Sequence, residues 1–88
     1  MTIDCELFVV KNNIIIGWYW LGQSAIAQEL TEENGFRKIK EGHYIIDKKA
    51  LLKFLEKAHE EKFAYVDTPY PEELQNLPDD AVWQVVVS

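Results

Sequence analysis

Ile14-Ile15-Ile16-Gly17-Trp18-Tyr19-Trp20-Leu21 is the most apolar run of the chain and decides which fold the sequence predicts. β-Branched and aromatic residues favour a strand, and here both alternating faces of the strand are apolar. A strand with two apolar faces is typical of the centre of a sheet that is covered on both sides. We therefore predict a central strand. Its core face is expected to hold Ile14, Ile16, Trp18 and Trp20.

Further strands are predicted on both sides of this run. Lys11-Asn12-Asn13 precedes it and is a plausible hairpin turn, because Asn tolerates a positive φ. Glu41-Gly42 is predicted to be the two-residue turn of a second hairpin. The remaining predicted strands are Cys5–Val10, the two arms of a hairpin within Phe36–Ile46, Phe63–Val66 and Ala81–Val87.

Two main helices are predicted from apolar residues at helical spacing. The first runs from Ala25 to Glu33 with Ser24 as its N-cap, and the second from Lys48 to Lys62 after Asp47. Pro71 is expected to begin a short helical turn. These elements predict a single α+β domain over residues 1–88. Its mostly antiparallel sheet has four to five strands, with the two main helices packed on one face.

Composition excludes several classes of protein. The 88 residues fit one domain, and a core this small is also compatible with a homodimer. The formal net charge of −6 argues against binding to nucleic acid or anionic membranes and is compatible with a protein partner that has a basic surface. Cys5 is the single cysteine, so a disulfide framework is excluded and a cytoplasmic location is expected. No apolar run reaches the roughly 18–20 residues that cross a bilayer.

Charge is distributed unevenly along the chain. The segment 63–88 contains five acidic residues and no Lys or Arg, which predicts an acidic surface that attracts a basic partner. Tyr70 stands between two prolines in this segment, where we expect an exposed aromatic ring. Tyr19 and the Trp20 end of the long apolar run are the other aromatic candidates. The predicted partner-binding residues are Asp67, Tyr70, Glu72, Glu73, Asp79, Asp80, Tyr19 and Trp20.

No motif in the sequence indicates catalysis or a bound cofactor. His43 and His59 stand 16 residues apart, and no local pattern joins either of them to Cys5 or Ser24 as a nucleophile and its base. The adjacent acids lack the spaced oxygen ligands of a calcium loop, and there is no phosphate-binding glycine loop. We therefore expect no enzyme, no cofactor and no metal site.

One segment has a partial resemblance to a known family. Gly42–Leu55 resembles the wing and following helix of excisionase-type winged helix-turn-helix domains, which would imply DNA binding through Arg37, Lys38 and Lys40. The match covers about a sixth of the chain, only one short helix precedes it, and the net charge has the opposite sign to that of a DNA-binding protein.

The leading hypothesis is a non-enzymatic protein-binding module. It would act as an inhibitor or antagonist, of the toxin-immunity or phage anti-defence type, by covering a partner's surface through the acidic segment and aromatic residues. A small-ligand or nucleotide binder that stacks its ligand on Trp18, Trp20 or Tyr44 is the first alternative. A winged-helix-like DNA-binding accessory protein is the second.

Overall fold

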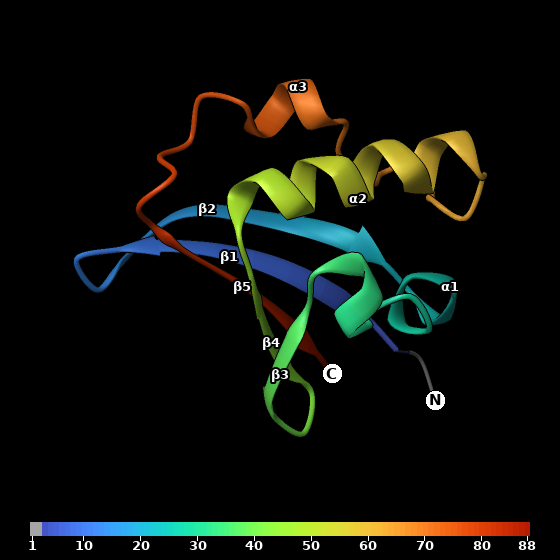
Figure 1. Ribbon diagram of the computed structural model, residues 1–88, viewed down its shortest axis with the longest axis horizontal. Helices are drawn as coiled ribbons and strands as arrows, with labels where there is room; N and C mark the ends of the chain where they lie inside the picture. Colours follow the sequence, from blue (N-terminus) through green and yellow to red (C-terminus); the bar gives the residue numbers. More distant parts are fainter. Residues whose placement is uncertain (1–2) are drawn as a thin grey trace.

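A five-stranded antiparallel sheet forms the centre of the molecule (Figure 1). The structure is a computed structural model, and it describes residues 3–88. The strands follow the spatial order β2-β1-β5-β4-β3, so β5 lies between the two hairpins and joins them. The strands are β1 (Cys5–Lys11), β2 (Ile14–Gly22), β3 (Arg37–Lys40), β4 (His43–Ile46) and β5 (Val82–Val87). The predicted small antiparallel-sheet domain is thus confirmed.

The core lies between one face of the sheet and the helices. Helix α2 (Lys48–Glu60) directs an apolar stripe at that face, and α3 (Pro71–Leu74) lies on the same side (Figure 1). On the strands, period-two alternation sends every second residue inward. The buried core comprises Cys5, Leu7, Val9, Leu21, Ile26, Leu30, Phe36, Ile46, Leu51, Phe54, Leu55, Ala58, Leu74, Trp83 and Val85.

The prediction of two main helices is wrong. Only α2, with 13 residues, exceeds four residues among the helices of the described chain. The expected first helix is divided into α1 (Ser24–Ala27) and the 3₁₀ turn η1 (Glu32–Asn34). Thr31 begins the second of these turns, because its side-chain oxygen accepts from the backbone N–H of Asn34.

Phe63–Val66 is not a strand. The backbone N–H groups of Phe63 and Ala64 both donate to Ala58 O and so close the end of α2. The next two residues begin a turn, in which Tyr65 N donates to Thr68 Oγ1 and Thr68 N donates to Tyr65 O. These backbone groups are used locally, so none of them is left for a ladder with another strand.

The predicted position of the long apolar run is also wrong. β2 is an edge strand, because β1 pairs with it on one side and with β5 on the other. Leu21 is buried, whereas Ile14, Ile16 and Trp18 are exposed and Trp20 is half-buried. The face that reaches the core is therefore the opposite one, which carries Gly17, Tyr19 and Leu21.

Candidate functional site: the helix-free face of the sheet

The face of the sheet turned away from α2 carries an apolar and aromatic surface. The register places Phe8 beside Trp18 on one side and Gln84 on the other, and it pairs Gln84 with Ile45. No helix of the described chain covers these residues (Figure 1). We call this surface the helix-free face. On β1, β2, β4 and β5 it comprises Glu6, Phe8, Val10, Ile15, Trp18, Trp20, His43, Ile45, Val82, Gln84 and Val86, and on β3 it ends at Arg37 and Lys40, opposite Ile45 and His43.

Two tryptophans on the helix-free face are held by carboxylates. Trp18 Nε1 donates to Glu6 Oε2 at 2.8 Å, and Trp20 Nε1 donates to Asp4 Oδ1 at 2.9 Å. The ring of Phe8 stacks on Trp18 with a centroid separation of 5.5 Å. Hydrogen bonds to charged acceptors are stronger than neutral ones, so they restrict the rotation of both indoles. Trp18 is nevertheless 65% exposed. The result is an aromatic surface that is ordered before any partner arrives.

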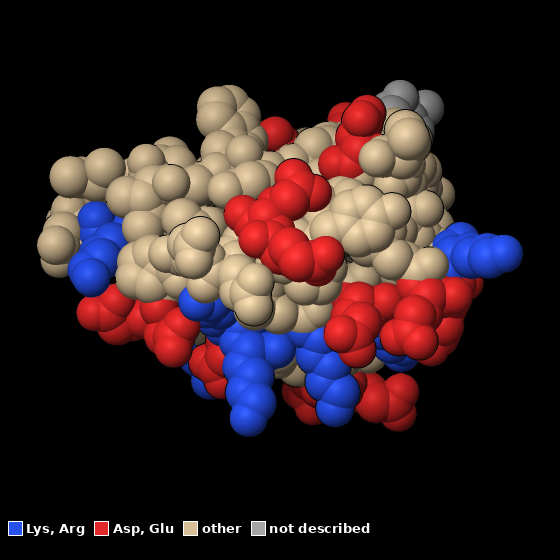
Figure 2. Space-filling model, turned by 90° about the horizontal axis from the view of Figure 1, so that it is seen from above, with Lys and Arg blue, Asp and Glu red and all other residues tan. Residues whose placement is uncertain are grey.

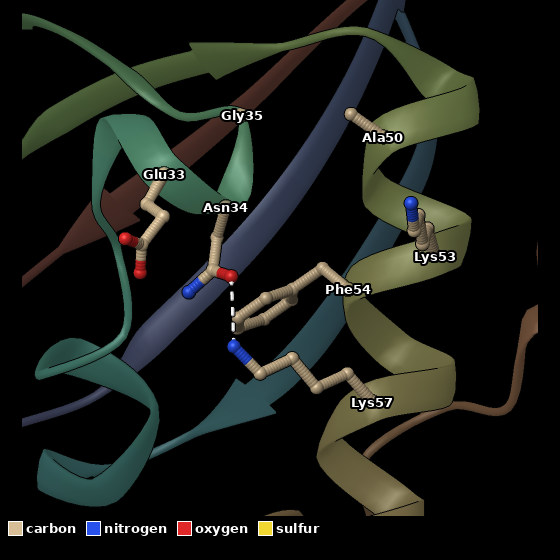
Figure 3. A pocket seen from close by; sticks show the side chains of 7 residues that line it. All are labelled: Glu33, Asn34, Gly35, Ala50, Lys53, Phe54 and Lys57. Carbon is tan, nitrogen blue, oxygen red and sulfur yellow. Dashed lines mark hydrogen bonds between the residues drawn. The ribbon is translucent and has the colours of Figure 1, made fainter.

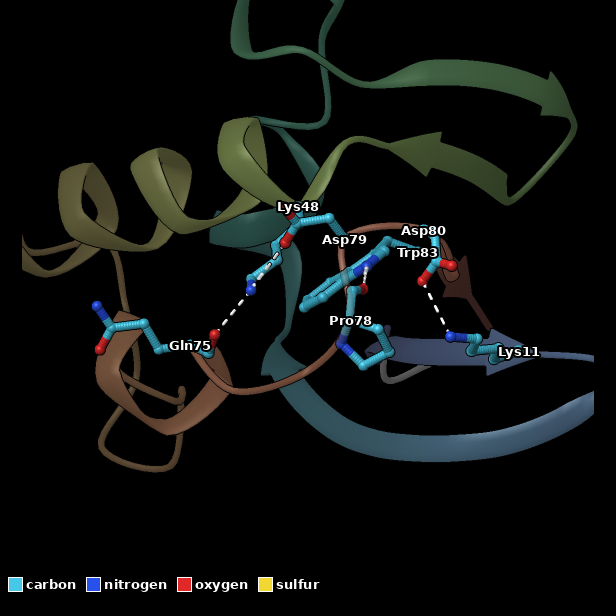
Figure 4. Close-up of polar contacts among 7 residues, drawn as sticks. All are labelled: Lys11, Lys48, Gln75, Pro78, Asp79, Asp80 and Trp83. Carbon is cyan, nitrogen blue, oxygen red and sulfur yellow. Dashed lines mark hydrogen bonds and ion pairs between the residues drawn. The ribbon is translucent and has the colours of Figure 1, made fainter.

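The predicted acids Asp79 and Asp80 already have intramolecular partners (Figure 4). Asp79 lies 3.0 Å from Lys48 Nζ on α2, and Asp80 lies 3.2 Å from Lys11 Nζ on β1. Lys48 also donates to Gln75 O. These contacts hold the segment that leads into β5 against α2 and β1. Both aspartates are largely solvent-exposed, so each ion pair contributes only about 0–1 kcal/mol to stability.

Tyr70, Glu72 and Glu73 lie together at α3. Glu73 Oε2 accepts from the backbone N–H of Tyr70 at 2.8 Å, which closes the start of this short helix. The Tyr70 ring, 52% exposed, stacks on the His59 ring at 3.8 Å. Figure 2, viewed from the α3 side, shows a central group of acidic side chains next to a row of Lys and Arg side chains. Glu72 and Glu73 are both exposed.

The predicted partner-binding residues therefore fall in separate places. Tyr70, Glu72 and Glu73 share α3, and exposed Asp67 precedes them in the loop. Trp20 lies on the helix-free face, whereas Tyr19 points to the opposite side and packs against the core. Phe8 was not among the predicted site residues, and Trp18 was predicted only as a stacking residue for the small-ligand alternative. Their shared face follows from the period-two pattern of β1 and β2 once the two strands are paired.

Cys5 is unsuited to nucleophilic chemistry. Its thiol is fully buried and donates weakly to Gln23 O at 3.8 Å. Burial, helped by the negative charge of Asp4, raises the pKa of the thiol to about 11. The reactive thiolate is therefore scarce at neutral pH.

This pKa shift predicts a pH-dependent stability. The thiol ionises near pH 9 in the unfolded chain and near 11 in the folded one, so the unfolded state loses its proton first as the pH rises. We expect the free energy of unfolding to fall between about pH 9 and 11, by at most roughly 3 kcal/mol. Urea unfolding of the wild type and of Cys5→Ala across this range measures the effect. All other ionisable groups are common to both proteins, so only the difference in stability between the two proteins reports on Cys5. An equal loss of stability in the wild type and in Cys5→Ala would contradict the assignment of this pH dependence to Cys5.

A pocket elsewhere on the molecule gives little indication of catalysis. A shallow pocket of about 290 Å³ lies between η1 and α2, where Lys57 Nζ donates to Asn34 Oδ1 at 3.0 Å (Figure 3). Residues 3–88 contain no cluster of three or more His, Cys, Asp or Glu side chains that could hold a metal ion. In the same residues, no helix has the length and apolarity that a membrane crossing requires.

Comparisons of the chain with protein-family models, with curated proteins and with solved structures found no match.

Proposed function

We propose that this protein is a non-enzymatic protein-binding module that covers a partner's surface with its helix-free face. The observation that carries the proposal is the pair of ordered tryptophans, Trp18 and Trp20, each held by a carboxylate on a face that no described helix covers. Tryptophan is enriched at the residues that contribute most to binding between proteins. Rings that are already restricted lose little further entropy when a partner binds.

The chemistry of this face fits a partner with basic side chains. Glu6 places negative charge directly beside the exposed indole of Trp18, and Asp4 does so beside the half-buried indole of Trp20. A Lys or Arg side chain laid on Trp18 would gain a cation–π contact and an ion pair with Glu6 together. The exposed acids at α3 and the net charge of −6 add a long-range attraction for the same partner.

A titration with N-acetyl-arginine amide tests this recognition directly. We expect the indole N–H resonance of Trp18 to shift in two-dimensional NMR spectra. Trp83 is an internal control, because its ring is buried and its Nε1 donates to Pro78 O. N-acetyl-glutamine amide has no charge and should give a much smaller shift. Equal shifts with both amides, or a shift of Trp83 as large as that of Trp18, would contradict charge-selective recognition by this face.

The proposed biological role is that of an inhibitor or antagonist, of the toxin-immunity or phage anti-defence type, that blocks a basic protein by covering its surface. We expect Trp18→Ala to weaken the complex by about 30-fold, the loss associated with a residue worth about 2 kcal/mol. The measurement is the affinity for the basic protein recovered with the wild type. Val66→Ala is the matched control, because Val66 is 95% exposed in the loop after α2. Equal weakening by both variants would argue against the helix-free face.

Nucleotide binding is the second candidate, because the exposed Trp18 ring is also a stacking surface for a base. Glu6 beside the ring would repel a phosphate, which favours the basic protein partner. Adenosine monophosphate in the same NMR titration distinguishes the two. A larger shift of Trp18 with the nucleotide than with the arginine amide would reverse the order of the candidates.

A further inference from the structure

The two edges of the sheet differ in length and charge. β3 has four residues, three of them basic, and lysines at an edge discourage pairing with other strands. β2 has nine residues, Ile14–Gly22, and none of them is charged. A long uncharged edge strand is the kind that pairs with another strand. The structure thus protects one edge and leaves the other open.

Exposed apolar side chains lie on both faces of β2. Ile14 is opposite Lys11, on the helix side, whereas Ile15 is opposite Val10, on the helix-free side with Trp18. Four of the nine large apolar residues that are exposed in the described chain belong to this strand. A partner lying on one face of the sheet would cover only part of them. An element that approaches the edge in the plane of the sheet would contact both sides.

Backbone groups of β2 are also free at this edge. In an antiparallel sheet, the backbone N–H and C=O groups of successive residues point to opposite sides of the strand. Asp4 and Ser88 exchange two hydrogen bonds, so the backbone groups of Asp4 point to the β5 side. Those of Glu6 and Phe8 therefore also point to β5, and those of Leu7 point to β2. Tyr19 is opposite Leu7 and is therefore bonded to β1.

Trp18 is the neighbour of Tyr19, so its backbone N–H and C=O point away from β1, to the open edge of the sheet. Nearer the end of the strand, Leu21 O accepts from Thr68 Oγ1 at 2.6 Å. The open part of the edge is therefore Ile14–Trp20.

We propose that a second copy of this chain covers the edge, with the two β2 strands paired antiparallel about a two-fold axis near the middle of Ile14–Trp20. A two-fold axis brings identical segments together, and this segment is apolar and β-branched or aromatic for nearly all of its length. Each copy carries a net charge of −6, but Ile14–Trp20 contains no charged residue. Pairing of the two segments therefore brings no like charges together.

The dimensions of the strand suit such a dimer. At about 3.4 Å per residue, the open segment Ile14–Trp20 offers a seam of roughly 24 Å, which is most of the 32 Å longest extent of the molecule. Edge pairing leaves the helix-free faces uncovered and joins them into one surface. The dimer therefore does not compete with the proposed binding of a basic partner, and it does not depend on that function.

Sedimentation velocity of the purified chain tests the dimer without any partner. We expect a species of twice 10.3 kDa at high micromolar concentration. Ile15→Lys should weaken the dimer at least about tenfold, because it places a charged side chain on the uncharged edge strand, where lysine discourages strand pairing. Ile39→Lys is the matched control. Ile39 is 53% exposed on the opposite edge, compared with 56% for Ile15, so its replacement should leave the dimer intact.

Hydrogen exchange identifies the edge that is paired. The Tyr19 amide should be protected at all concentrations, whereas the Trp18 amide should become protected only where the dimer forms. A wild type that stays monomeric at high micromolar concentration would overturn the proposal. A dimer that Ile39→Lys disrupts and Ile15→Lys does not would overturn it equally. Circular dichroism of both variants verifies that they are folded.

Discussion

Gly22→Ala is expected to lower the free energy of unfolding by roughly 3–5 kcal/mol. A Cβ at Gly22 would overlap Ile26 Cγ1 and would lie 2.7 Å from Tyr65 Cδ1. Neither neighbour is free to move, because Ile26 is fully buried and the Tyr65 hydroxyl accepts from Ala25 N. Gly22 also has a φ of 151°, which side chains rarely adopt. Small domains have only about 5–15 kcal/mol of stability, so this one methyl group would remove a large share.

Gly17→Ala is the matched control on the same strand. A Cβ there would lie 3.1 Å from Tyr19 Cε1 and 3.3 Å from Leu77 Cδ1, both at the ends of side chains that can shift slightly. We expect a cost below about 1.5 kcal/mol. Chemical denaturation of both variants gives the comparison. Equal stabilities would show that the contact of Gly22 with α1 and the 63–68 turn is less tight than described.

Thr68→Val should destabilise the fold by about 3 kcal/mol although the two side chains have nearly the same shape. Thr68 is the one polar side chain among the buried residues of the described chain. Its hydroxyl donates to Leu21 O at 2.6 Å and accepts from Tyr65 N at 2.8 Å, so it ties the turn after α2 to the end of β2. Valine would leave a buried donor and a buried acceptor without partners.

The Thr68→Ser variant distinguishes the contribution of the hydroxyl group to stability from that of the methyl group. Serine keeps both hydrogen bonds and loses one buried methyl, for which we expect a cost of about 1 kcal/mol. The predicted order of stability in urea denaturation is therefore wild type, Thr68→Ser, Thr68→Val. The reverse order of the two variants would mean that methyl packing, and not hydrogen bonding, fixes this turn.

Patterns that act over a few residues predicted their elements correctly. The apolar stripe of Lys48–Glu60 gave α2, Pro71 begins α3, and Gly42, with a φ of 76°, lies in the turn between β3 and β4. Lys11-Asn12-Asn13 likewise forms a turn in which both asparagines have positive φ. In each case the deciding interaction is local, so the sequence carries it directly.

The errors arose where distant segments decide the outcome. Whether β2 is central or at an edge depends on β5, which lies about 60 residues later in the chain and takes the other side of β1. Phe63–Val66 has the composition of a strand, but its backbone groups close α2 and form a turn with Thr68. The split between α1 and η1 could have been read from Thr31, which is a good N-cap residue.

The aromatic surface was only partly accessible to sequence reasoning. Alternation along β2 placed Trp18 and Trp20 on one face but did not say which face the helices cover. That choice follows from Gly17 and Tyr19, where a glycine leaves room for Leu77 and Val9 on the helix side. The carboxylate partners Glu6 and Asp4 belong to β1 and the residue before it, so their contacts with the indoles depend on the hairpin register.

The position of β5 between the two hairpins has a consequence for the timing of folding. The β1–β2 and β3–β4 hairpins each close over a few residues and can form while the chain is still being synthesised. Neither hairpin pairs with the other, and both bond to β5. Residues 82–87 are the last to leave the ribosome among these elements. The complete sheet can therefore assemble only after translation has passed them, and until then a nascent chain would leave the edges of β1 and β4 that face β5 unpaired.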